Sequence, residues 1–352
     1  MSEALPAAWA KITRDLSLHG GDRPMAALPD ATRALMAEIG PKWGTDIQKY
    51  RDMVLAAYAP LLANSPKDGV TVTREHAYGP HERHRLDVFR PEGAERAPVV
   101  VFVHGGAFLR GSKSVPDGIY DNVTYWFARQ GCLGVNIEYR LAPEAPFPAG
   151  AEDLAAAVTW VKQNAAAHGG DPEKIFLVGH SAGATHVAGY AFDPNIAAKP
   201  GAELCGMVLI SGRLRIDASP ENPNARGVRA YFGEDESLYE VRSPVTHAHL
   251  CRQPVMIAIA EFDNPLLDIY GAEFFWRVAM KSRKAPRFVR MALHNHSSMA
   301  MHFNTGEEVL GREILRFMVE NSGYGPGALV RLTAAIAALL RALARSFDFK
   351  ST

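Results

Sequence analysis

The spacing of apolar residues differs between the first part of the chain and the rest. Up to about residue 66, apolar side chains such as Leu35 and Ile39 recur at helical spacing, with proline and glycine between the segments. From Val70 onward, short apolar runs replace that spacing. The run 98–103 is apolar on both faces, which is typical of a central strand in a parallel sheet. The pattern predicts an N-terminal helical region, 1–66, followed by a domain built on a sheet.

Strands and helices are expected to alternate through that domain. The apolar runs predict strands at 70–78, 84–90, 98–103, 133–139, 174–179, 206–211, 254–260 and 287–293. Helical spacing predicts helices at about 117–130, 150–168, 182–192, 266–282 and 299–321. Such alternation builds an α/β fold with a mostly parallel eight-stranded sheet flanked by helices, whose strand carboxyl ends form the active face.

Three further segments complete the expected organisation. The N-terminal region is interpreted as a helical cap over a catalytic domain at 67–322, although it could equally pad the flank of the core. Residues 212–253 contain no clear strand, and so long a loop in a compact domain is usually functional, so we expect an insertion that forms part of a pocket. Residues 323–352 are expected to form an amphipathic helix that packs on the cap, makes a homodimer contact or touches a membrane surface.

The amino-acid composition and the charge balance limit the kinds of molecule that the protein is expected to bind. The chain has 352 residues, 47% hydrophobic and 22% charged, which fits a globular protein with a large core. No apolar run approaches the roughly 18 residues of a membrane span. Basic and acidic residues balance at 38 each, so no overall field favours nucleic acid. We expect a cytoplasmic protein that acts on a small molecule, has reduced cysteines and uses neither metal nor cofactor.

The stretch Gly179–Gly183, with sequence GHSAG, follows an apolar strand and opens a small-residue helix. A strand that turns sharply into a helix holds its corner residue in a strained conformation, and its neighbours must be small. The pattern therefore indicates a nucleophile elbow with Ser181 at the corner. A serine hydroxyl needs a base, a carboxylate that orients the base and donors for a developing oxyanion.

A glycine pair supplies candidate oxyanion donors. His104, Gly105 and Gly106 directly follow the strand 98–103, where a glycine turn can point amide N–H groups into one cavity. We predict an oxyanion hole formed by the amides of Gly105, Gly106 and Ala182. His104 is interpreted as a residue that holds this loop rather than as a base.

The acid and the base are expected after later strands. Asp263 follows the strand 254–260 and precedes an Asn-Pro turn, so we prefer it to Glu261 and Asp268 as the acid. His296 lies in the loop after the strand 287–293, and His294 is its rival as the base. The chain order serine, aspartate, histidine is that of α/β-hydrolases.

Three motifs together resemble the hormone-sensitive-lipase-like family of α/β-hydrolase carboxylesterases. They are HGGAF at 104–108, YRLAPEAPFPA at 139–149 and GHSAG at 179–183. The resemblance covers about residues 84–320 and implies the α/β-hydrolase fold, an N-terminal helical cap, short-to-medium acyl esters and no cofactor. Departures from the family pattern are Ala107 in place of a third glycine, His180 in place of an acidic residue, the extra Asn264 and the segment 294–298, which differs from the usual ending.

The function expected is hydrolysis of carboxylic esters of short-to-medium acyl or aryl type through an acyl-enzyme. Related arylformamidases share the elbow, so an amide or carbamate substrate is the alternative, and a non-catalytic ligand-binding homologue is a third hypothesis. Aromatic residues near the expected active face suggest a substrate pocket formed by Phe108, Trp126 and Tyr190, unless they belong to the core. The arginines at 213, 215, 226 and 229 could attract a carboxylate-bearing substrate or simply belong to a solvated loop.

Overall fold

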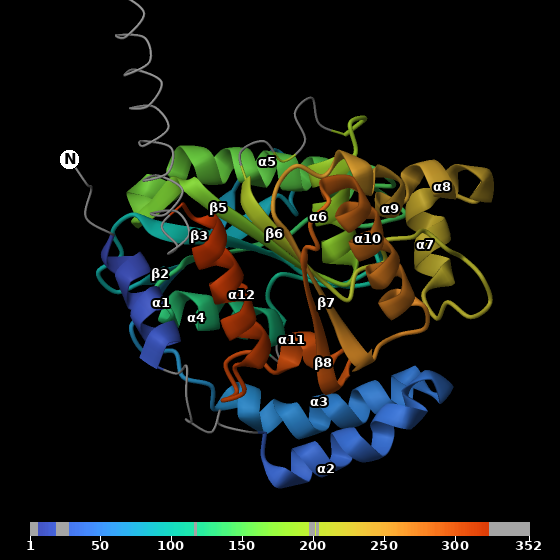
Figure 1. Cartoon of the computed structure of the whole chain (residues 1–352), viewed down its shortest axis with the longest axis horizontal. Helices are drawn as coiled ribbons and strands as arrows, with labels where there is room; N and C mark the ends of the chain where they lie inside the picture. The colour runs from blue at the N-terminus through green and yellow to red at the C-terminus, as the bar shows by residue number, and fades with distance from the viewer. Residues whose placement is uncertain (1–5, 19–27, 116–117, 197–200, 202–203, 324–352) are drawn as a thin grey trace, which may run out of the picture.

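The computed structural model describes residues 6–18, 28–115, 118–196, 201 and 204–323 (Figure 1). Its centre is one eight-stranded sheet with the order β1-β2-β4-β3-β5-β6-β7-β8. β2 pairs antiparallel with both β1 and β4, and the other pairings are parallel. The strands are β1 Val70–Ala77, β2 Arg85–Pro91, β3 Ala97–Val103, β4 Leu133–Ile137, β5 Gly170–His180, β6 Leu204–Ile210, β7 Val255–Phe262 and β8 Arg287–Asn295.

Helices cover both faces of the sheet. One face packs against α5 (Ala149–Asn164), α6 (Ala182–Phe192) and α10 (Leu267–Ser282), and the buried side chains of β3 alternate between the two faces. The opposite face packs against α1 (Ala7–Leu18), α4 (Ile119–Arg129) and α12 (Val309–Asn321). Burial on both faces explains why the central strands read as continuous apolar runs.

A smaller helical layer lies across the carboxyl ends of β7 and β8 (Figure 1). It contains α2 (Asp30–Ile39), the 3₁₀ turn η1 (Gly40–Thr45) and α3 (Ile47–Ala63). This layer has its own apolar cluster, which includes Met36, Trp43 and Tyr58 and also Met301 from the segment that follows β8. Within the predicted cap region 1–66, α1 instead packs on a face of the sheet through Trp9. The cap over the strand ends is therefore α2, η1 and α3.

Two expectations need correction. The single helix expected at 299–321 is two helices, α11 (Ser298–Met301) and α12, because Asn304 and Gly306 adopt positive φ angles of 61° and 101° between them. The segment 212–253 has no strand, as expected, but it is not one continuous loop, because it contains the short helices α7 (Ala225–Phe232), α8 (Tyr239–Arg242) and α9 (Pro244–His247). The helix expected at 323–352 falls outside the described residues from position 324 onward.

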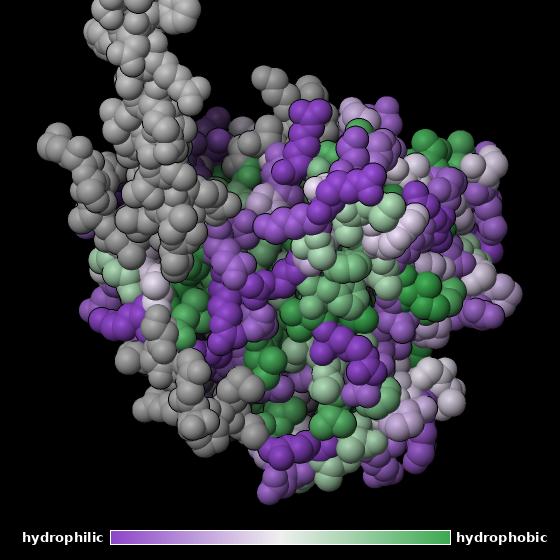
Figure 2. Space-filling model, in the orientation of Figure 1, coloured by the Kyte–Doolittle hydropathy of each residue, from purple (hydrophilic) through white to green (hydrophobic). Residues whose placement is uncertain are grey.

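On the face drawn in Figure 2, polar side chains predominate toward the rim and apolar side chains gather near the middle. Exposed large apolar residues include Ile269, Trp276 and Met280 of α10. Among the described residues, none of the helices has the length and apolar character that a bilayer crossing requires.

Candidate active site

The corner between β5 and α6 has the geometry of a nucleophile elbow. Ser181 occupies it with φ 56° and ψ −121°, a strained conformation for a residue with a side chain. A Cβ atom on Gly183 would lie 2.1 Å from the carbonyl oxygen of Val103, and one on Gly179 would lie 2.6 Å from that of Gly183. Both glycines are therefore required for the close approach of helix and strand.

The structure brings the three predicted triad residues together. Ser181 Oγ lies 2.9 Å from His296 Nε2, and His296 Nδ1 lies 2.8 Å from Asp263 Oδ1. Asp263 follows the end of β7, and His296 follows the end of β8. The hydroxyl, imidazole and carboxylate thus form one chain of hydrogen bonds, an arrangement that can remove a proton from serine.

Asp263 sits in a set of hydrogen-bond donors. Its Oδ2 accepts from Ser211 Oγ at 2.6 Å and from the amide of Ala260 at 3.1 Å, while Oδ1 also accepts from the amide of Asn264 at 2.9 Å. Burial alone would raise the pKa of this carboxyl, but the bonds from His296, Ser211 and Ala260 outweigh it and lower the pKa. The carboxylate stays ionised and keeps the imidazole in one orientation.

The predicted oxyanion loop lies beside Ser181. Gly105 and Gly106 line the same cavity as Ser181, and Ala182 is the first residue of α6. A Cβ on Gly105 would lie 2.9 Å from that of Ser181. Gly106 has φ 148°, and a Cβ there would lie 1.7 Å from the carbonyl oxygen of Arg110. The loop therefore needs both glycines to pass this close to the nucleophile.

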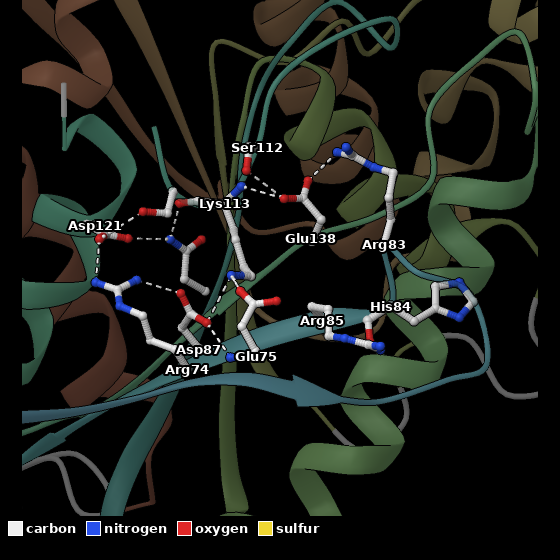
Figure 3. A network of polar contacts seen from close by, with 12 residues as sticks. Arg74, Glu75, Arg83, His84, Arg85, Asp87, Ser112, Lys113, Asp121 and Glu138 are labelled. Carbon is white, nitrogen blue, oxygen red and sulfur yellow. Dashed lines mark hydrogen bonds and ion pairs between the residues drawn. The ribbon is translucent and has the colours of Figure 1, made fainter. Parts of the chain in front are cut away.

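A buried polar network holds the end of this loop (Figure 3). Glu138, just after β4, accepts from His104 Nε2 at 3.0 Å, Ser112 Oγ at 2.7 Å and the Lys113 amide at 3.1 Å, and it also pairs with Arg83. Burial raises the pKa of Glu138, but the His104 and Ser112 hydrogen bonds and the charges of His104 and Arg83 lower it overall. His104 thus supports the loop, and the sequence offered no signal for its partner Glu138.

The Lys113 side chain extends this network toward β1 and β2. Its ammonium pairs with Glu75 and lies 2.9 Å from Asp87 Oδ1, while Arg74 bridges Asp87 and Asp121 at 2.6 and 2.7 Å (Figure 3). The segment after the oxyanion loop is therefore tied to the antiparallel edge of the sheet.

His294 and Glu261, the alternative base and acid, form hydrogen bonds outside the predicted triad. His294 contacts Ser298 Oγ at 2.9 Å and Glu307 at 3.0 Å. Glu261 accepts from the amide of Leu293 at 2.7 Å and pairs with Arg290 on the surface.

His180 supports the position of His296. Its Nε2 donates to the backbone carbonyl of His296 at 3.0 Å, and burial together with the neighbouring His296 lowers the pKa of His180 to about 3. A neutral imidazole therefore stands where the family pattern has an acidic residue.

A cavity of about 390 Å³ opens above Ser181. Helix α3 and its preceding turn contribute a large share of its wall, and α4 and α11 supply other apolar parts. The cap residues that line it are Trp43, Ile47, Gln48, Arg51 and Leu55. From the insertion 212–253, only Pro223 and Asn224 reach this cavity.

The predicted substrate-binding aromatics are not in this cavity wall. Phe108 is 2% exposed and stacks on Tyr231, with ring centroids 5.0 Å apart. Its φ of 68° is in the left-handed region, and its ring packs in the apolar cluster that contains Phe232. Trp126 and Tyr190 are 2% and 3% exposed and pack in the two clusters on either side of the sheet. All three side chains are therefore buried in apolar clusters, and a role for them in substrate binding stays a prediction from the sequence.

Comparison with known proteins agrees with this architecture. The family model described as BD-FAE matches residues 86–194, which include the predicted oxyanion loop and the corner at Ser181. Carboxylesterase NlhH of Mycobacterium tuberculosis is 42% identical over 98 residues, or 26% of this chain and 28% of that protein. Probable carboxylesterase 1 of Arabidopsis thaliana is 28% identical over 209 residues, or 54% and 63%. The matched part thus spans less than two thirds of either relative's length.

A solved structure shows the same fold over most of the chain. The hyperthermophilic esterase from the archaeon Pyrobaculum calidifontis has a TM-score of 0.62 at 23% identity, covering 83% of this chain and 97% of that one. With the elbow geometry and the eight-stranded sheet, this likeness identifies the fold as that of the α/β-hydrolases.

Proposed function

We propose that the protein is a serine hydrolase of carboxylic esters. The observation that carries this proposal is the continuous hydrogen-bonded chain from Ser181 through His296 to Asp263, at 2.9 and 2.8 Å. The carboxylesterases among its relatives support an ester as the substrate.

The reaction follows from the geometry. His296 Nε2 takes the proton of Ser181 as Oγ attacks the ester carbonyl, and the imidazolium then protonates the departing alcohol. Water, deprotonated by the same imidazole, attacks the acyl-enzyme; the acid is released and Ser181 regains its proton. Asp263 stabilises the imidazolium in both halves without taking the proton.

Gly105, Gly106 and Ala182 would donate their amides to the oxyanion. Loss of one such donor typically lowers kcat about a hundredfold to a thousandfold. Apolar side chains in the cavity wall, such as Leu55, Val115 and Ile119, suit a short-to-medium acyl group, and the volume of about 390 Å³ limits its size.

Replacement of the nucleophile tests this proposal. Ser181→Ala should abolish hydrolysis of 4-nitrophenyl butyrate and labelling by a fluorophosphonate probe, with an unchanged circular dichroism spectrum. Ser237→Ala, an exposed serine of the insertion, is the matched control and should retain both. Full activity of Ser181→Ala would contradict the mechanism, and absence of probe labelling in the unmodified protein would favour a non-catalytic binding protein.

The same triad could attack an amide or a carbamate. Rates on a matched aryl ester and aryl amide discriminate these functions, and we expect kcat/KM to be larger for the ester. Cytoplasmic location and homodimer formation stay predictions from the sequence.

A further inference from the structure

We propose that the preferred ester carries a carboxylate on its acyl chain, bound by Arg51 and Arg110. This inference rests on the proposed function and names the substrate class of the same site.

The charged side chains of the cavity wall are positive. The described residues that line the cavity include Arg51 and Arg110 but no aspartate or glutamate. The acid of the triad, Asp263, is buried behind His296. A cleft with one sign of charge and low-dielectric walls concentrates ligands of the opposite sign. An acyl group that ends in a carboxylate matches this wall better than a neutral one.

Arg110 stands at a defined position beside the oxyanion loop. Its backbone amide donates to the carbonyl of Gly106 at 3.1 Å, which closes the turn that carries the glycines. Its side chain is exposed, and within the described part of the chain it has no carboxylate at ion-pair distance. A guanidinium held near the site without a partner is available to a ligand.

Arg51 faces the same space from the cap. It lies one turn along α3 from Ile47 and one turn before Leu55, and all three line the cavity. Its Nε lies 3.6 Å from Asp52, whose side chain is 57% exposed and does not line the cavity. The terminal nitrogens make no hydrogen bond within the described residues, so they can bind a second anion.

Tyr120 lies in the same cavity wall as both arginines. Gly105 and Gly106, whose amides are proposed oxyanion donors, line this wall as well. Burial raises the pKa of Tyr120 to about 12, while the charges of Arg51 and Arg110 act on its hydroxyl in the opposite direction. The two arginines therefore share one cavity with the proposed oxyanion donors.

Arg226 does not line the cavity, and the other three arginines of the predicted cluster at 213, 215, 226 and 229 have partners of their own. Arg213 binds Asn222 and Asp217, Arg215 pairs with Glu273 and Glu240, and Arg229 pairs with Glu236. Their charges are balanced by acids of the same region. Hydrolysis leaves the substrate carboxylate unchanged, so the acid product is a dicarboxylate and the other product is the alcohol.

A matched pair of substrates tests the inference. Mono-4-nitrophenyl adipate and 4-nitrophenyl hexanoate have the same chain length and leaving group and differ in a terminal carboxylate. We expect a larger kcat/KM for the adipate ester at low salt, and a smaller preference at high salt because the attraction is screened. Adipate should inhibit hexanoate hydrolysis more strongly than inorganic phosphate does.

The two arginines are then replaced one at a time. Arg51→Gln and Arg110→Gln should each lower kcat/KM for the adipate ester about tenfold to a hundredfold more than for the hexanoate ester, the usual effect of one charge-assisted contact. Arg252→Gln is the matched control, since Arg252 is exposed before the start of β7, at the opposite end of the sheet from the site.

The outcomes separate the two proposals. Hydrolysis of the hexanoate ester without preference for adipate, or a preference that neither variant reduces, would overturn the carboxylate site and leave the esterase proposal intact. Failure to cleave either ester, with no fluorophosphonate labelling of Ser181, would overturn both.

Discussion

The indole Nε1 of Trp43 donates a 2.9 Å hydrogen bond to the side-chain oxygen of Asn264, and both residues are buried. Asn264 in turn donates its backbone amide to Oδ1 of Asp263. The cap is thus linked through two hydrogen bonds to the carboxylate of the proposed triad. Asn264 is the residue that departs from the family pattern at this position, and the cap contact gives it a role.

Trp43→Phe should destabilise the protein and slow catalysis. The substitution keeps an aromatic ring but leaves the Asn264 oxygen buried without a donor, which typically costs about 1–3 kcal/mol. We expect that loss in the free energy of unfolding in urea. We also expect kcat/KM on a neutral ester to fall severalfold, because Asn264 then holds Asp263 less firmly.

Trp126→Phe is the matched control for this experiment. Trp126 is as deeply buried as Trp43, but within the described residues its Nε1 has no hydrogen-bond partner. Equal losses of stability and activity in the two variants would show that indole packing, and not the bond to Asn264, matters.

Local patterns were sufficient to predict the sheet and the positions that approach Ser181. The continuous apolar run of β3 reflects burial on both faces of the sheet. The glycines at 179 and 183 reflect the close approach of helix and strand backbones. Both features can be recognised from a few neighbouring residues. The side-chain direction of Phe108 was not predictable, because its φ of 68° turns it away from the cavity. Trp43 and Asn264 are 221 positions apart, and no local spacing indicates such a contact.

Glu138→Gln should lower kcat with little change in KM. Glu138 accepts hydrogen bonds from His104, Ser112 Oγ and the Lys113 amide, which together hold the loop that carries the proposed oxyanion donors. Those donors act mainly in the transition state, so their displacement affects kcat, and we expect a fall of about tenfold. Glu261→Gln is the control, since Glu261 lies near the end of β7 and its side chain accepts from the Leu293 amide of β8 rather than from the glycine loop. A rise in KM at constant kcat would instead assign Glu138 to substrate binding.

Lowering the pH should destabilise the protein at pH values well above those at which carboxylates become protonated. Burial lowers the pKa of His180 and His186 to about 3 and that of His302 to about 4, and it also lowers the pKa of His84 and His168. Below the ordinary histidine pKa of 6.5, the unfolded chain binds protons that the folded protein does not. Stability is therefore complete above pH 6.5 and falls as the pH drops. Each of the three fully buried histidines, His180, His186 and His302, contributes up to about 1.4 kcal/mol per pH unit.

Urea unfolding at several pH values between 5 and 6.5 measures this slope. The carboxyls of Asp263 and Glu138 have lowered pKa values, so their stabilising contributions are lost only at lower pH and do not enter this window. His186→Gln should reduce the slope by up to about 1.4 kcal/mol per pH unit, because one buried neutral histidine is removed. His249→Gln, at an exposed position, should leave it unchanged. An unaltered slope in His186→Gln would mean that His186 titrates alike in both states.

Gly183→Ala should disrupt the elbow more than any exposed glycine substitution. The added Cβ would lie 2.1 Å from the carbonyl oxygen of Val103 and 2.5 Å from that of His104, and backbone atoms cannot rotate away as a side chain can. Helix α6 must move from β3, and a displacement of about 1 Å at a nucleophile can cost a hundredfold in rate. We expect a loss of about 1–3 kcal/mol or more in the free energy of unfolding and a loss of at least about a hundredfold in kcat/KM. Gly44→Ala is the control, since nothing lies within 4 Å of its added Cβ, and its stability should change by no more than about 0.5 kcal/mol. A Gly183→Ala protein as stable and active as Gly44→Ala would show that the elbow tolerates a wider separation of helix and strand than this packing implies.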